Sequence, residues 1–195
     1  MFILTFPCKS DSTFLSSTLP RIISPLTDRS VGKMSKRLHF DDLNVGDQWN
    51  THGRTLTQAD IVNFACMSGD FNPLHVDEEY ASRTPFGQTI AHGLLGLAWV
   101  AGLSSENPAV QTSAFVCIRD WQFHRPIYPG DTVSVETKVA EKHEKGRRNG
   151  RIVWLLRLLN QRGEIVQEGF FETLVAKRMQ NNGSHDSAAS VRQGV

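Results

Sequence analysis

Cysteine is scarce in this chain, and the few thiols follow no disulfide or metal-binding pattern. The 195 residues include only three cysteines, Cys8, Cys66 and Cys117. Their number is odd, and no CxxC or combined Cys/His ligand spacing occurs, so neither a disulfide framework nor a structural zinc site is expected. We expect buried thiols in a reducing compartment.

An excess of charge is also lacking. Lys plus Arg total 21 and Asp plus Glu total 20, which gives a formal net charge of +1. Overall charge therefore gives no reason to expect nucleic acid or a membrane surface as a partner. No apolar run approaches the length of a membrane span. We expect a cytoplasmic protein, or a mitochondrial one if its N-terminal segment is a transit peptide.

The two ends of the chain differ in composition from its middle. Residues 1–37 are rich in Ser, Thr and Pro, show no steady hydrophobic period, and hold more basic than acidic residues. We expect a disordered extension there. It is either an organelle transit segment or, as we favour, the product of a start codon assigned too early, with Met34 as the working start. Residues 179–195 are polar and expected to be a disordered tail, so one domain spans 38–178.

Two helices are indicated in the first half of this domain. Thr57 followed by Asp60 is typical of a helix N-cap, apolar residues then recur at helical spacing, and Gly69 follows. These signals predict a helix over Gln58–Ser68. The segment Ile90–Leu103 has almost no polar face, which predicts a wholly buried helix. At about fourteen residues it is too short to cross a bilayer.

The second half of the domain has the alternation and composition of β-strands. An Asn-Gly hairpin signal occurs at Arg148-Asn149-Gly150. Helices segregated from a run of antiparallel strands make an α+β fold, with one long buried helix wrapped by a curved antiparallel sheet. The expected strands are Gln48–Thr55, Ser113–Phe123, Thr132–Glu144, Arg151–Asn160 and Ile165–Ala176, with a short acidic helix around Asp77–Ser82.

The chemistry-bearing residues lie in two short strings. Gly69-Asp70-Phe71-Asn72-Pro73-Leu74-His75 is followed by Ala91-His92-Gly93 at the head of the apolar segment. Together with Val45-Gly46-Asp47 and the run from Arg125 to Asp131, these strings resemble the MaoC-like dehydratases, which include the (R)-specific enoyl-CoA hydratases. The similarity covers roughly Phe40–Ala176.

The resemblance implies a hotdog fold, a homodimer or higher homo-oligomer with its active site near the subunit interface, and an acyl-CoA thioester substrate. It implies that Asp70 and His75 are the catalytic pair and that Gly93 supplies an oxyanion-binding amide. Some hydratases of this kind carry a serine further along the buried helix, where Ala101 stands in this sequence.

Hydration of a 2-enoyl thioester suits these residue types. A carboxylate and an imidazole on either side of one water can move its protons, and the sequence leaves open how Asp70 and His75 share that work. A backbone N–H at a helix start can hold the charge that develops on the thioester oxygen. Pro73 and Asn72 are expected to fix the turn, and His92 to orient Gly93 or line the pocket. No metal or cofactor is expected.

Other interpretations remain open at this level. The Gly69–Pro73 string could be only a helix-ending turn, with Asp70 as a cap and His75 packed in the core. The protein could also be a thioesterase on the same scaffold, or a non-catalytic acyl-CoA-binding subunit. A cluster of basic residues is expected at a hairpin tip, where we favour a solvated turn over a site for CoA phosphates. The cluster comprises Lys142, Lys145, Arg147, Arg148 and Arg151.

Overall fold

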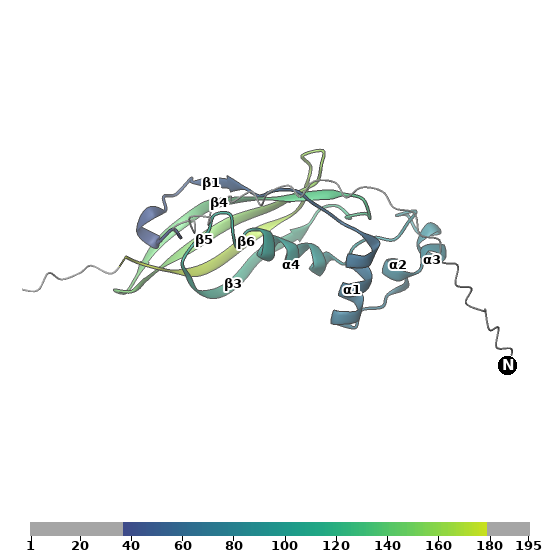
Figure 1. The fold of residues 1–195 in the computed structure, drawn as a ribbon, viewed down its shortest axis with the longest axis horizontal. Coiled ribbons are helices and arrows are strands. Elements are labelled where there is room, and N and C mark those ends of the chain that lie inside the picture. Colours follow the sequence, from purple (N-terminus) through teal and green to yellow (C-terminus); the bar gives the residue numbers. More distant parts are fainter. Residues whose placement is uncertain (1–36, 179–195) are drawn as a thin grey trace, which may run out of the picture. The chain divides into compact units, whose positions relative to one another are not determined.

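A computed structural model describes residues 37–178 of the chain, and its main element is an antiparallel sheet (Figure 1). The strands run in the order β1-β4-β5-β6-β3, and β2 also pairs with β4. The strands are β1 (Gln48–Asn50), β2 (Arg54–Thr55), β3 (Thr112–Phe123), β4 (Thr132–Lys145), β5 (Asn149–Leu159) and β6 (Ile165–Ala176). The helices are η1 (Phe40–Asp42), α1 (Gln58–Ser68), α2 (Pro73–Val76), α3 (Glu78–Ser82) and α4 (Gly93–Leu103).

Helix α4 packs against the inner face of the sheet and forms the centre of the core. Leu95, Trp99 and Val100 on the helix belong to one buried cluster with strand residues such as Val139 and Leu156. The expected helix over Ile90–Leu103 therefore exists, but it begins three residues later. Residues 90 and 91 lie before the helix, and their amides donate to the carbonyls of Leu74 and Ile127.

The expectation that this helix is wholly buried was wrong for the chain on its own. Leu94 is 60% exposed, and Ala98 and Ala101 are also exposed. The reason is that one side of α4 faces the sheet, whereas the opposite side, though equally apolar, has no layer of residues 37–178 over it.

Helix α1 has the predicted bounds, and its N-terminus is held by a capping box. The Thr57 hydroxyl accepts from the Asp60 N–H, and the Asp60 carboxylate accepts from the Thr57 N–H at 2.9 Å. Burial alone would raise the pKa of Asp60, but its hydrogen bonds with Thr57 and Arg54 together outweigh burial and lower that pKa. At the other end Gly69 adopts φ +78°, a left-handed conformation that favours glycine.

Two local predictions need correction. The strand expected over Gln48–Thr55 is split into β1 and β2, because the Thr51 hydroxyl accepts from the Val135 N–H where the ladder would use a carbonyl. The β4–β5 turn comes earlier than the Asn-Gly signal indicated. Gly146 has φ +70°, and Asn149 pairs with Lys145 inside the ladder.

The two cysteines in the described part of the chain are not buried. Cys66 is exposed on α1 and Cys117 is half-buried on the outermost strand β3. The expectation of buried thiols was therefore wrong for both. Within residues 37–178, no helix is long and apolar enough to cross a bilayer. The predictions for residues 1–36, for Cys8 and for the C-terminal tail lie outside the described residues.

Candidate active site

The Asp70–His75 string connects α1 to α2 and is ordered by its own side chains. The Asp70 carboxylate accepts from the Asn72 N–H at 3.2 Å, and the Asn72 side chain accepts from the Leu74 N–H at 3.0 Å. Pro73 occupies the first turn of α2, where its missing N–H costs no hydrogen bond. Asn72 is therefore the helix cap, and His75 lies one turn into the short helix.

His75 is a buried imidazole with a fixed orientation. Its exposed fraction is 9%, and its Nδ1 lies 2.7 Å from the carbonyl oxygen of Ile90. A carbonyl can only accept, so Nδ1 carries the hydrogen and Nε2 of the neutral ring is left with a free lone pair. That is the state that a general base requires.

His92 joins this pair more closely than the sequence alone indicated. It is 3% exposed, and its Nε2 donates to the backbone carbonyl of Asp70 at 2.9 Å. Its ring stacks on that of His75 with centroids 3.7 Å apart and planes inclined by 29°. The ring of Phe64 in α1 packs on the His92 ring, with centroids 5.0 Å apart. No residue within 37–178 hydrogen-bonds to its buried Nδ1.

Three potential ligand groups therefore meet at one place. Asp70, His75 and His92 each offer one atom, and these atoms lie within 4.8 Å of one another. Each histidine already uses one ring nitrogen on a carbonyl, so a cation bound here would have only the carboxylate and the two remaining nitrogens. The same geometry suits a proton-transfer pair, and the absence of a metal remains a prediction.

Gly93 is the first residue of α4, directly after His92. The first amide that bonds within the helix is that of Leu95, which donates to the His92 carbonyl at 3.0 Å. The N–H groups of Gly93 and Leu94 thus precede the intrahelical ladder and point outward. Gly93 is exposed and lines a pocket of about 320 Å³ together with His92, Phe123, Arg125 and Gln167.

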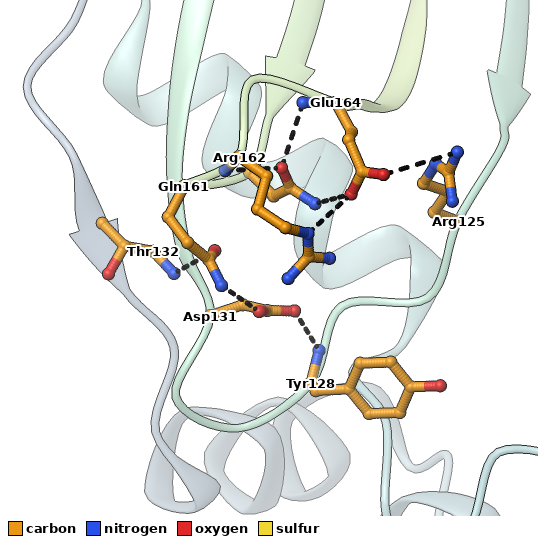
Figure 2. A network of polar contacts seen from close by, with 8 residues as sticks. Arg125, Tyr128, Asp131, Thr132, Gln161, Arg162 and Glu164 are labelled. Atoms are coloured by element: carbon orange, nitrogen blue, oxygen red, sulfur yellow. Dashed lines mark hydrogen bonds and ion pairs between the residues drawn. The ribbon is translucent and has the colours of Figure 1, made fainter.

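Arg125, which lines this pocket, belongs to a polar network at the β3–β4 and β5–β6 connections (Figure 2). Asp131 accepts from the Tyr128 N–H at 2.9 Å and from the Gln161 side chain at 2.7 Å. Arg125 pairs with Glu164 at 3.6 Å. The network fixes the segment whose Ile127 carbonyl accepts from Ala91, and so it fixes the approach to α4.

Two other sets of predicted residues lie away from this cluster. Ala101 lines a second cavity, of about 270 Å³, with Trp154, Leu156 and Phe171 of the sheet. Lys142, at the basic hairpin, donates to the Leu43 carbonyl beside η1, and Figure 1 places η1 and α2 at opposite ends of the sheet. One basic group of the hairpin is thus already used in packing.

The sequence did not single out Gln167. Its side chain donates from Nε2 to the Gly93 carbonyl at 3.1 Å and accepts from Nε1 of Trp121 at 3.2 Å. The one signal in the sequence that could have indicated Gln167 is that a polar residue stands at a core-facing position of an otherwise apolar strand.

Comparison with known proteins identifies relatives of the central region. The family described as the MaoC like domain matches residues 42–153. Protein MaoC of Klebsiella aerogenes is 36% identical over 113 residues, which are 58% of this chain and 34% of that protein. The 3-hydroxybutyryl-CoA dehydratase of Methylorubrum extorquens is 38% identical over 114 residues, covering 57% of this chain and 69% of that enzyme. The chain thus spans about a third of the first relative and just over two thirds of the second.

Solved structures agree with the fold. An Archaeoglobus protein described as a monoamine oxidase regulatory protein has a TM-score of 0.69 at 33% identity, over 73% of this chain and 97% of that one. A Mycobacterium tuberculosis protein with a double hotdog fold has a TM-score of 0.64 at 21% identity, over 73% of this chain and 45% of that one. The antiparallel sheet around α4 is therefore a hotdog fold. By the extent of the family match, this chain belongs to the MaoC-like domain family.

Proposed function

We propose that this protein is a hydro-lyase that interconverts a 2-enoyl-CoA and a 3-hydroxyacyl-CoA. The observation that carries the proposal is the gathering of the Asp70 carboxylate and the two stacked imidazoles within 4.8 Å, beside the first turn of α4. The relative named 3-hydroxybutyryl-CoA dehydratase supports the same type of reaction.

In this mechanism Asp70 and His75 flank the water that adds to C3. One member of the pair takes a proton from the water as its oxygen bonds to C3, and the pair returns a proton to C2, so the thioester is saturated without being cleaved. The exposed carboxylate can reach the water, and Nε2 of His75 has its lone pair free. Because the groups are close, their two protonation steps belong to the pair.

The third contribution comes from the start of α4. Negative charge builds on the thioester oxygen while C2 is carbanion-like, and the outward N–H of Gly93 is the proposed donor to that oxygen. Loss of such a donor in other enzymes lowers kcat by about 100- to 1000-fold. The glycine leaves no side chain between this amide and the substrate.

We propose further that the protein works as a homodimer. β3 ends the sheet on one side, and Phe115, Val116 and Ile118 on it are exposed, as is Leu94 of α4. Unpaired outer strands with exposed apolar side chains are normally protected in soluble proteins. Sedimentation analysis tests this proposal: the wild type should be dimeric and Ile118→Lys should shift it toward monomer, whereas a monomeric wild type would contradict it.

Crotonyl-CoA separates the proposed reaction from its alternatives. A hydratase removes the enoyl absorbance without releasing free thiol, a thioesterase releases thiol, and a binding subunit does neither while still binding the thioester. Asp70→Asn and His75→Ala should strongly lower the rate of hydration and leave the fold intact. Release of free thiol by the wild type would overturn the proposal.

A further inference from the structure

Gln167 is a buried amide for which the proposed reaction has so far given no role. It lies on the inner face of β6, two residues before Gly169, and is 2% exposed. Trp121 can only donate, so its bond to Oε1 leaves Nε2 of Gln167 directed at the Gly93 carbonyl, 3.1 Å away. Both ends of the amide are thus committed.

The neighbouring strand contacts the same glycine from another side. Phe123 of β3 is paired directly with Gln167 of β6 in the sheet. A Cβ placed on Gly93 would lie 2.9 Å from Cε1 of Phe123, so the ring packs against the glycine itself. One cross-strand pair therefore contacts Gly93 at its carbonyl and at its Cα.

Gly96, one turn further along α4, makes this contact possible. A Cβ at that position would lie only 2.3 Å from Nε2 of Gln167. Any side chain there would push the amide away from the Gly93 carbonyl. Gln167 can therefore reach the Gly93 carbonyl only because residue 96 is a glycine.

We infer that Gln167 is a positioning residue that holds the first turn of α4, with Phe123 on its other side, so that the Gly93 N–H faces the thioester oxygen. The inference rests on the proposed function, because it explains how the oxyanion donor of the proposed active site is held in position. A helix start has few hydrogen bonds of its own, and a glycine there has much conformational freedom. Misplacement of a catalytic group by about 1 Å can lower the rate by about 100-fold.

The test compares two glycines of the same helix. Gly96→Ala should displace Gln167, whereas Gly102→Ala, with nothing within 4 Å of its new Cβ, is the matched control. Gln167→Met keeps the size of the side chain and removes the donor. We expect Gly96→Ala and Gln167→Met to lower kcat by about 100-fold, and Gly102→Ala to retain wild-type kcat.

The effects of the variants on kcat and on substrate binding distinguish a positioning role of Gln167 from a merely structural one. If the Gly93 donor acts mainly in the transition state, kcat should fall while the Kd of the saturated analogue butyryl-CoA changes by no more than about threefold. In a Gln167→Ala background, where the amide is gone, Gly96→Ala should cause no further loss. Folded Gln167→Met with wild-type kcat, or equal damage from Gly96→Ala and Gly102→Ala, would overturn the inference.

The amide resonance of Gly93 in ¹⁵N-labelled protein tests the same contact without turnover. It should shift, and its hydrogen exchange should accelerate, in Gln167→Met and Gly96→Ala but not in Gly102→Ala. A wild type that hydrates no enoyl-CoA would refute the proposed function. An unmoved Gly93 resonance in Gln167→Met would instead refute the positioning role.

Discussion

The imidazole rings of His75 and His92 stack with centroids 3.7 Å apart, although the two residues belong to separate segments of the chain. His75 lies in α2, and His92 occupies the N-cap position directly before α4. His92 also donates to the carbonyl of Asp70, so a single side chain contacts both members of the proposed catalytic pair. The spacing between the Asp/His string and the Gly93 amide therefore depends on His92.

His92→Ala should lower kcat by about 10- to 100-fold, because the Asp70 turn loses its tie to α4. His92→Gln is the matched control, since its terminal amide can donate to the same carbonyl as Nε2 and should restore part of the activity. Steady-state kinetics on crotonyl-CoA measure both variants. Equal activity of His92→Ala, His92→Gln and the wild type would show that the hydrogen bond from His92 to the Asp70 carbonyl has no part in the reaction.

Much of this architecture could be predicted from local patterns. The bounds of α1 follow from a capping box at Thr57 and a left-handed glycine at residue 69, both readable within a few residues. The ladder strands β3 to β6 were placed to within two residues because alternation and turn signals are also local. The hotdog fold expected from the resemblance is confirmed by the structural relatives.

Contacts between distant segments could not be predicted in this way. Gln167 and Gly93 are 74 residues apart, and nothing in either local sequence indicates that they meet. Gly150 looked like a turn residue, but its role is packing, since a Cβ there would lie 2.1 Å from the ring of Phe40. The open face of α4 was missed for a related reason, because an apolar pattern does not say what covers each side.

Gly150→Ala should therefore destabilise the fold. The new methyl group would overlap the buried Phe40 ring, and overpacking of this kind typically costs about 1–3 kcal/mol. Thermal unfolding measures the effect, with Gly102→Ala as a control that has free space and should not lower Tm. A Tm for Gly150→Ala equal to that of the wild type would contradict the packing role.

The capping box of α1 should make stability depend on pH. The pKa of Asp60 is lowered in the folded state, so its contribution is fully present above the unfolded pKa of about 4 and is lost as pH falls through the folded value. Asp60→Asn should cost about 1 kcal/mol at neutral pH. The difference from wild type should shrink below about pH 4, as measured by urea denaturation. A constant difference down to pH 2 would contradict this account.

The proposed proton transfer requires no metal. Prolonged treatment with a chelator, followed by removal of the chelator, should leave crotonyl-CoA hydration unchanged, and elemental analysis should find no stoichiometric metal. Loss of activity that returns on addition of zinc would show instead that Asp70, His75 and His92 bind a cation. Their potential ligand atoms lie within 4.8 Å of one another, which is close enough for such a site.

The central claim is tested most directly by following enoyl absorbance and free thiol together on crotonyl-CoA, with wild type, Asp70→Asn and His75→Ala. Asn retains an oxygen to accept from the Asn72 N–H, so the turn should persist in that variant. The wild type should consume the double bond without releasing thiol, and each substitution should lower kcat by about 100- to 10,000-fold. Thiol release by the wild type, or undiminished hydration by either folded variant, would contradict the account.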